Sequence, residues 1–237
     1  MWHARTSLVL ILLLPLVALG CSSSSKRKAF GWPKLPSWSK PKISYAPNRP
    51  GTVARPSLAA QEQACLARGY ARKNRFVQIQ SSLGGPLRGC GAARAFVMSA
   101  NGRGTVQLHP PATLRCPMIP AVERWLETVV QPAARRHLWR DLSGITVIAS
   151  YSCRTRNSIP GAKLSEHGRA NALDVSAFRL RDGRVIKVKT AWRSWGSEGR
   201  FIRAVHRGAC RHFTTVLGPN ADRYHHDHFH LDLARHG

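Results

Sequence analysis

The chain has 237 residues and 43% hydrophobic content, which suits one domain of ordinary size with appendages and excludes several large domains. Its 37 Lys and Arg against 11 Asp and Glu give a formal net charge of +26. This charge predicts attraction to polyanions such as lipopolysaccharide, anionic lipid, acidic wall polymers or nucleic acid. A solvated basic surface without a specific partner explains it equally well, so charge alone does not choose a function.

Residues 1–21 have the features of a secretory signal. The apolar run LVLILLLPLVALG is too short to span a bilayer comfortably, and it ends in small residues before Cys21. Cys21 after Ala-Leu-Gly resembles a bacterial lipoprotein cleavage box, in which the cysteine is acylated. A larger aliphatic residue is usual where Ala18 stands, and an ordinary signal peptide with a chance cysteine is the alternative. We expect export and lipidation at Cys21, with Ser22 favouring the outer membrane.

Residues 22–56 predict a disordered or extended basic tether. The segment is rich in Ser, Pro and Lys and shows no hydrophobic period. It would give the following domain reach from a membrane.

Residues 57–237 predict a globular domain. Ser57 is the expected N-cap and Gly69 the stop of a first helix. Two further helices are expected at 117–138 and 198–213, and strands or hairpins at 75–80, 94–109, 144–152, 170–190, 214–218 and 228–234. Strands mixed with helices in this order predict an α+β fold with a small antiparallel sheet.

Five cysteines follow Cys21, and export makes disulfides the expected state. Five is odd, so at least one thiol stays free or pairs elsewhere. We expect a Cys153–Cys210 bridge, because these two residues flank the His/Asp-rich region. A second bridge would join two of the other three. No CxxC pair is present to favour a zinc finger.

Histidines and aspartates gather in two stretches, SEHGRANALD at 165–174 and YHHDHFHLDL at 224–233. His228 and His230 alternate on a predicted strand, so both side chains point to one face. If that strand lies beside the one with Asp174, then His167, Asp174 and His230 converge. Two imidazoles and a carboxylate suit Zn²⁺, which would lower the pKa of a bound water to near 7.

Two plainer interpretations remain for these residues. His-rich tails are often incidental, and Asp174, which stands between Leu173 and Val175, could be satisfied by a buried Arg or by exposure. A metal ion would also remove the cost of burying that carboxylate.

The motifs SYSCR, SEH-x-x-x-N-A-L-D, C-x-x-F-x-x-VLGP and HFHLDLA, in this order, are similar to the bacterial extensin-like C-terminal family. That family resembles the zinc peptidases of the lysostaphin, D-Ala-D-Ala carboxypeptidase and hedgehog (LAS) group. The resemblance implies an LAS-like fold with His167, Asp174 and His230 as zinc ligands. It covers about residues 59–234.

The resemblance also implies catalytic roles. Asp227 matches the general base of the carboxypeptidases, and His228 matches the assisting histidine of the endopeptidases; strand geometry favours His228, and the choice stays open. Arg154 matches an arginine that grips substrate or stabilises an oxyanion. We expect Ser165 to orient its loop and Asp232 to orient a ligand imidazole or form a salt bridge. Ala170 replaces a glycine common in carboxypeptidases, which puts substrate choice in doubt.

The sequence therefore predicts a periplasmic, lipid-anchored zinc peptidase that cleaves peptidoglycan stem peptides or crosslinks, as a DD-endopeptidase or DD-carboxypeptidase. The alternative is a non-catalytic peptidoglycan-binding lipoprotein with a structural or vestigial zinc site. A nucleic-acid binder is disfavoured, because no recognition motif is present and export removes the chain from nucleic acid. The sequence does not indicate the oligomeric state.

Overall fold

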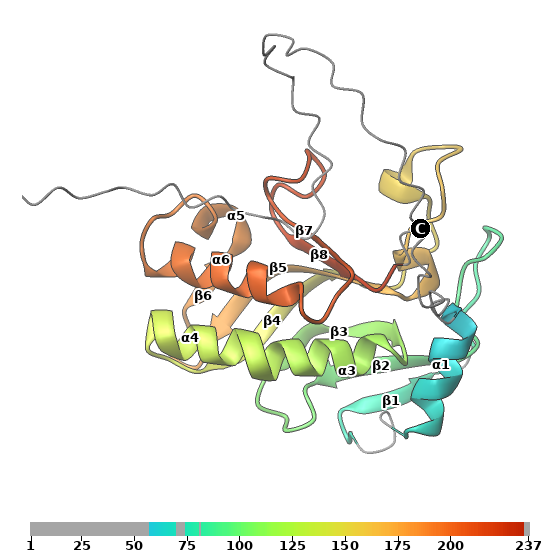
Figure 1. Cartoon of the computed structure of the whole chain (residues 1–237), viewed down its shortest axis with the longest axis horizontal. Helices are drawn as coiled ribbons and strands as arrows, with labels where there is room; N and C mark the ends of the chain where they lie inside the picture. The colour runs from blue at the N-terminus through green and yellow to red at the C-terminus, as the bar shows by residue number, and fades with distance from the viewer. Residues whose placement is uncertain (1–56, 70–73, 81, 235–237) are drawn as a thin grey trace, which may run out of the picture.

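The computed structural model describes residues 57–69, 74–80 and 82–234. The predicted signal sequence, the lipidation site at Cys21 and the tether of residues 22–56 lie outside the described residues. The described part forms an α+β domain in which helices flank an eight-stranded sheet (Figure 1). The predicted fold class is confirmed.

The sheet is larger than expected and mixed. Its order is β1-β2-β3-β4-β5-β8-β7, with β6 paired to β5. The strands are β1 (Val77–Gln80), β2 (Ala95–Ala100), β3 (Gln107–Arg115), β4 (Leu142–Ala149), β5 (Ala172–Leu180), β6 (Val185–Lys187), β7 (Thr215–Leu217) and β8 (Phe229–Asp232). All pairings are antiparallel except that of β3 with β4. The helix between those two strands supplies the long crossover that a parallel pair requires, which the sequence pattern did not indicate.

The described helices include the three that the sequence predicts, close to their expected positions, and a short one at the end of the segment 170–190 that was predicted as a hairpin. They are α1 (Leu58–Ala67), α3 (Met118–Trp125), η1 (Leu126–Val130), α4 (Gln131–Leu138), α5 (Val188–Ala191) and α6 (Ser197–Ala209), with short 3₁₀ turns η2 (Arg156–Ser158) and η3 (His167–Arg169). Ser57 caps α1 as predicted, because its hydroxyl accepts a hydrogen bond from the Ala60 N–H at 3.1 Å. Within the described ranges, no helix has both the length and the apolar character needed to cross a bilayer.

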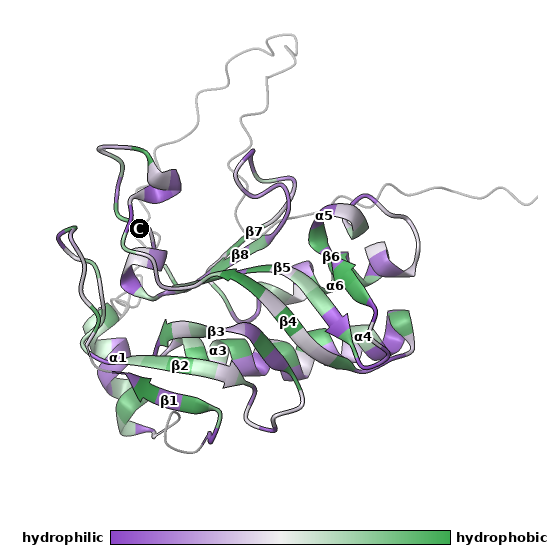
Figure 2. Ribbon diagram, turned by 180° about the vertical axis from the view of Figure 1, so that it is seen from behind, coloured by the Kyte–Doolittle hydropathy of each residue, from purple (hydrophilic) through white to green (hydrophobic). Residues whose placement is uncertain are grey.

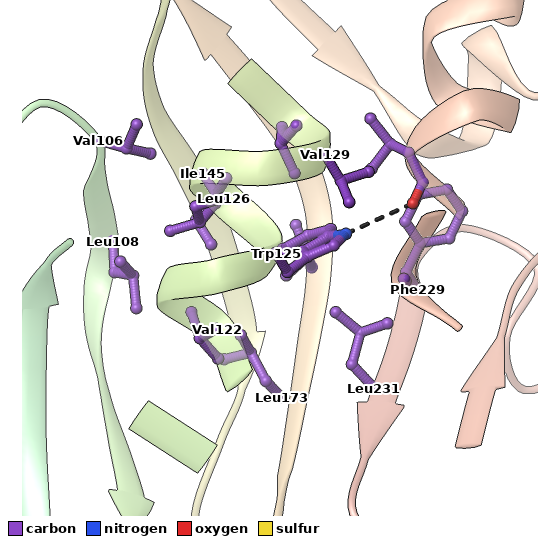
Figure 3. Close-up of a cluster of buried hydrophobic side chains, with 14 of the residues drawn as sticks. Val106, Leu108, Val122, Trp125, Leu126, Val129, Ile145, Leu173, Phe229 and Leu231 are labelled. Carbon is purple, nitrogen blue, oxygen red and sulfur yellow. Dashed lines mark hydrogen bonds between the residues drawn. The ribbon is translucent and has the colours of Figure 1, made fainter. Parts of the chain in front are cut away.

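One long helix and α6 cover the same face of the sheet (Figures 1 and 2). The long helix consists of α3, the π-helical turn η1 and α4, which follow one another without a break. Trp125, where α3 ends, is fully buried, and its indole N–H donates to the Val205 carbonyl of α6 at 3.4 Å (Figure 3). Its ring meets Phe178 of β5 edge to face, with centroids 6.1 Å apart. This core fixes β5 and β8, the strands that carry the candidate site.

Candidate metal centre

Asp174 and His230 lie directly opposite each other on neighbouring strands. The antiparallel register of β5 and β8 pairs the two residues, so their side chains leave the same face of the sheet. Both are buried, with 5% and 9% exposure. The His230 Nδ1 atom lies 2.8 Å from the Asp174 Oδ1 atom. β5 and β8 are therefore neighbours, as the prediction of the three ligands required.

His167 enters the site from the loop between β4 and β5. It begins the 3₁₀ turn η3, where its N–H donates to the Ser165 hydroxyl at 3.3 Å. Ala170 closes the turn with a positive φ of 51°, a conformation that favours glycine. Glu166 holds the far side of the loop by accepting hydrogen bonds from Arg169 and Asn171 at 2.9 and 2.6 Å. Ser165 thus orients the loop, as expected.

The three predicted ligands meet at one point. One ligand atom from each of His167, Asp174 and His230 lies within 4.8 Å of the others. The His167 Nε2 atom is 3.1 Å from Asp174 Oδ2 and 3.2 Å from His230 Nδ1. These residues could hold a metal ion.

The outer hydrogen bonds decide which imidazole nitrogens carry protons. The His167 Nδ1 atom faces the Ser150 carbonyl at 2.6 Å, and His230 Nε2 faces the Asp232 carboxylate at 2.9 Å. Both partners can only accept, so both outer nitrogens carry the hydrogen. The inner nitrogens of the neutral rings then present lone pairs toward each other and toward the Asp174 carboxylate.

Three inward-facing acceptors repel one another unless a positive charge lies between them. A proton is one such charge: burial opposes it, but hydrogen bonds to Asp174 and Asp232 raise the pKa of His230 to about 9. Burial likewise opposes ionisation of Asp174, yet the hydrogen bonds from His167 and His230 hold its pKa well below the usual value. A divalent cation is the other such charge, and the donor set of two imidazoles and one carboxylate suits zinc.

His228 lies beside the three ligands and is held by Asp227. The His228 Nδ1 atom is 2.8 Å from Asp227 Oδ1, which accepts its proton. The other nitrogen, Nε2, is 3.6 Å from Asp174 Oδ2. Of the two residues, His228 is the one whose side chain lines the cleft. Asp227 is 40% exposed and orients it from outside.

His225 is a further residue of the site, which the sequence patterns did not single out. Its ring centroid lies 5.4 Å from that of His228 and 5.5 Å from that of His230. Its Nδ1 atom is 2.7 Å from Asp222 Oδ1, so a third histidine of this segment is oriented by an aspartate. The spacing His225-x-x-His228-x-His230 was the signal that could have identified it.

Three other histidines of the described residues lie outside the cleft. His226 is exposed and bonds to the Arg223 carbonyl, and His212 meets Thr128. His206 packs between Trp192 and Phe229, in the core behind β8.

The three predicted metal ligands line a cleft of about 510 Å³. Arg154, predicted to grip substrate, lines it, and so does Arg156. Both arginines belong to the loop that follows β4, and Tyr224 belongs to the loop before β8. The cleft therefore combines the candidate metal ligands with two guanidinium groups.

The predicted Cys153–Cys210 bridge is wrong. Cys153 is bonded to Cys90, and a second bridge joins Cys65 to Cys116. The loop between β1 and β2 brings Cys90 against the metal-binding loop, where a Cβ added to Gly168 would lie 3.3 Å from the Cys90 sulfur. A loop that is distant in sequence is thus bonded to the metal-binding region. The prediction missed this bridge because it considered only cysteines that flank the His/Asp-rich region in sequence.

A comparison with protein families decides the membership of the chain. The model described as "Extensin-like protein C-terminus" matches residues 63–237. The chain belongs to the extensin-like C-terminal family. No curated protein and no solved structure matches it. The extensin-like domain therefore contains the whole candidate metal centre, from the Cys65 bridge to β8.

Proposed function

We propose that the extensin-like domain is a zinc-dependent peptidase that hydrolyses an amide bond in peptidoglycan stem peptides or crosslinks. The observation that carries the proposal is the convergence of three buried metal-binding groups, those of His167, Asp174 and His230. The outer hydrogen bonds of the two histidines leave their inner nitrogens with lone pairs for a cation. These are the same three residues that the resemblance to the LAS group implies as zinc ligands. Zinc bound there would supply Lewis acidity and lower the pKa of a water molecule.

His228 is suited to move the proton. Its Nδ1–H is fixed by Asp227, so Nε2 is free to take a proton from the attacking water and to deliver it to the leaving amine. This division of roles makes His228 the acid–base group and Asp227 its positioning residue. His225 is held in the same way by Asp222, so its Nε2 atom is also an acceptor beside His228.

Arg154 and Arg156 are suited to bind a carboxylate of the substrate. Both line the cleft, and a guanidinium binds a carboxylate through two parallel hydrogen bonds. Stem peptides carry such groups at their ends and on their side chains. Export and lipidation at Cys21 would place the domain beside this substrate.

The test is release of fragments from purified sacculi by the full chain, in the presence of zinc. Wild type should release products, while Asp174→Ala should lose both zinc and turnover. His228→Ala should keep zinc, measured by elemental analysis, and lose turnover by about 100-fold or more. His212→Ala is the matched control, because His212 contacts Thr128 and lies outside the cleft, and it should behave as wild type.

The products identify the bond. Loss of a terminal residue indicates a carboxypeptidase, and conversion of dimers to monomers indicates an endopeptidase. Zinc binding with sacculus pull-down but no product, unchanged by His228→Ala, would refute the enzyme and leave the wall-binding alternative.

A further inference from the structure

Two tryptophans are exposed at one side of the molecule, away from the cleft. Trp139 ends α4 and is 79% exposed, and Trp195 precedes α6 and is 89% exposed. Figures 1 and 2 show the C-terminal end of α4 and the N-terminal end of α6 together at one side of the domain. The loop that follows β4 and lines the cleft lies at the other side (Figure 1). The catalytic proposal leaves both indoles unexplained.

The backbone conformation at Trp139 is unfavourable for a residue with a side chain. Trp139 has a φ of 57° and a ψ of 29°, in the left-handed region. Glycine is the usual residue at such a helix end, because a Cβ atom is strained there. Since the indole is mostly exposed, packing does not offset that strain. The indole therefore contributes little to the stability of the fold, which points to a role in binding another molecule.

Arginines without carboxylate partners surround the two indoles. Arg200 donates to the Trp195 carbonyl at 3.3 Å, and the Arg203 guanidinium lies 5.7 Å from the Trp195 ring centroid. Arg136 of α4 and Arg207 of α6 are exposed, and no acid within the described ranges pairs with either. Burial lowers the pKa of His137, and the charges of Arg136, Arg200 and Arg207 lower it further, so these groups lie close together.

A hollow of about 490 Å³ beside Trp139 adds to this surface. It is lined by Arg135, Arg140 and Arg181, with Asp141 as the acid. Arg135 is paired with Asp141 at 2.6 Å and Arg140 with Asp182 at 3.5 Å. Arg181 forms no ion pair in the part of the chain that the structure describes, although its charge also acts on Asp141. A phosphate group could occupy a hollow of this size and charge.

We propose that Trp139, Trp195 and the arginines between them dock the domain on an anionic lipid bilayer, through headgroup phosphates. Tryptophan is the residue that prefers the boundary between headgroups and acyl chains, and arginines beside it bind the negative surface. The charge of the surface is complementary to such a membrane. Docking by this side leaves the cleft on the other side open to solvent and substrate. The proposal does not depend on the peptidase activity.

Vesicle flotation of the full chain tests this. Vesicles of phosphatidylcholine with about a third phosphatidylglycerol are compared with phosphatidylcholine alone, so that the lipid charge is the variable. Arg136→Gln with Arg200→Gln should weaken binding to anionic vesicles about 30-fold. Arg75→Gln with Arg88→Gln is the matched control, because both residues are exposed, remote from the two helix ends and equal in charge. All variants share the first 56 residues, so any contribution of that segment cancels.

The tryptophans provide a second readout. Trp139→Gly with Trp195→Ala should weaken binding at least about tenfold and abolish most quenching of fluorescence by brominated acyl chains. Trp139→Gly alone should raise the melting temperature, which separates lost binding from lost folding.

Two outcomes would overturn the proposal. Equal binding by the Arg136/Arg200 and Arg75/Arg88 variants would show that only net charge matters. Loss of binding in the arginine variant but not in the tryptophan variant, with inorganic polyphosphate competing fully, would assign the surface to a soluble polyanion instead.

Discussion

Asp232 controls the proton on His230, so replacing it with asparagine should weaken zinc binding without altering the ligand set. Asp232 is 4% exposed, its Oδ1 accepts the Ala234 N–H at 2.8 Å, and its Oδ2 faces His230 Nε2 at 2.9 Å. In Asp232→Asn the amide oxygen keeps the Ala234 contact, so the NH₂ group faces the imidazole. The N–H of the asparagine amide and an N–H on His230 Nε2 are both donors, so they cannot form a hydrogen bond with each other.

His230 must then move its proton to Nδ1, the atom that faces Asp174. The lone pair that binds metal is lost, unless the ring keeps its proton on Nε2 and leaves a buried hydrogen bond unmade. That choice costs about 1–3 kcal/mol. Since 1.4 kcal/mol is tenfold in an equilibrium constant, we expect a 10- to 100-fold weaker zinc affinity, the usual range for such outer partners.

The assay is competition for zinc against a chromophoric chelator at neutral pH, with thermal unfolding to show that the variant is folded. Asp227→Asn is the control, because Asp227 contacts His228 and no predicted ligand. Its zinc affinity should stay within about threefold of wild type, although its turnover should fall. Unchanged affinity in Asp232→Asn, or an equal loss in both variants, would refute the assignment of His230 as a ligand through Nδ1.

Two further predictions concern stability. Burial lowers the pKa of His206 to about 4 from 6.5, so the unfolded chain binds more protons between these values. Stability should be complete above pH 6.5 and fall by about 3 kcal/mol toward pH 4; denaturant titrations of His206→Leu should lack this part of the decline, and an identical pH profile would contradict it. The Cys90–Cys153 bridge closes a 63-residue separation, so its loss should cost about 4 kcal/mol and weaken zinc binding. Mild reduction with thiol mapping should open it before the buried Cys65–Cys116 bridge, and the reverse order would count against this.

The strands that carry the ligands could be predicted because they obey simple rules. Alternation along HFHLDL put His228 and His230 on one face, and an aspartate in the apolar run ALDV required a partner. The structure places Asp174 opposite His230, which satisfies both patterns at once. These are local regularities, and the pairing of β5 with β8 shows them without a register shift.

The remaining features depend on contacts that are distant in sequence. The Cys90–Cys153 bridge forms because the loop after β1 folds onto the exit of β4, where Tyr151 also donates to the Gly84 carbonyl at 2.6 Å. The parallel pairing of β3 with β4 follows from the packing of a helix that looks the same in either topology. His225 stands in an irregular loop, where no periodicity indicates the direction of a side chain.

The positions of the acidic residues bear on both the candidate metal site and the arginine-rich side of the domain. The chain has 11 acids for 37 Lys and Arg, yet Asp222, Asp227 and Asp232 each orient a histidine. Asp174 faces His167 and His230. A net charge of +26 repels a divalent cation at long range, but salt screens exposed charges beyond about 8 Å. Buried donors within 4.8 Å of one another are screened far less. The local acids can therefore hold a cation while the arginines at the other side attract a negatively charged surface.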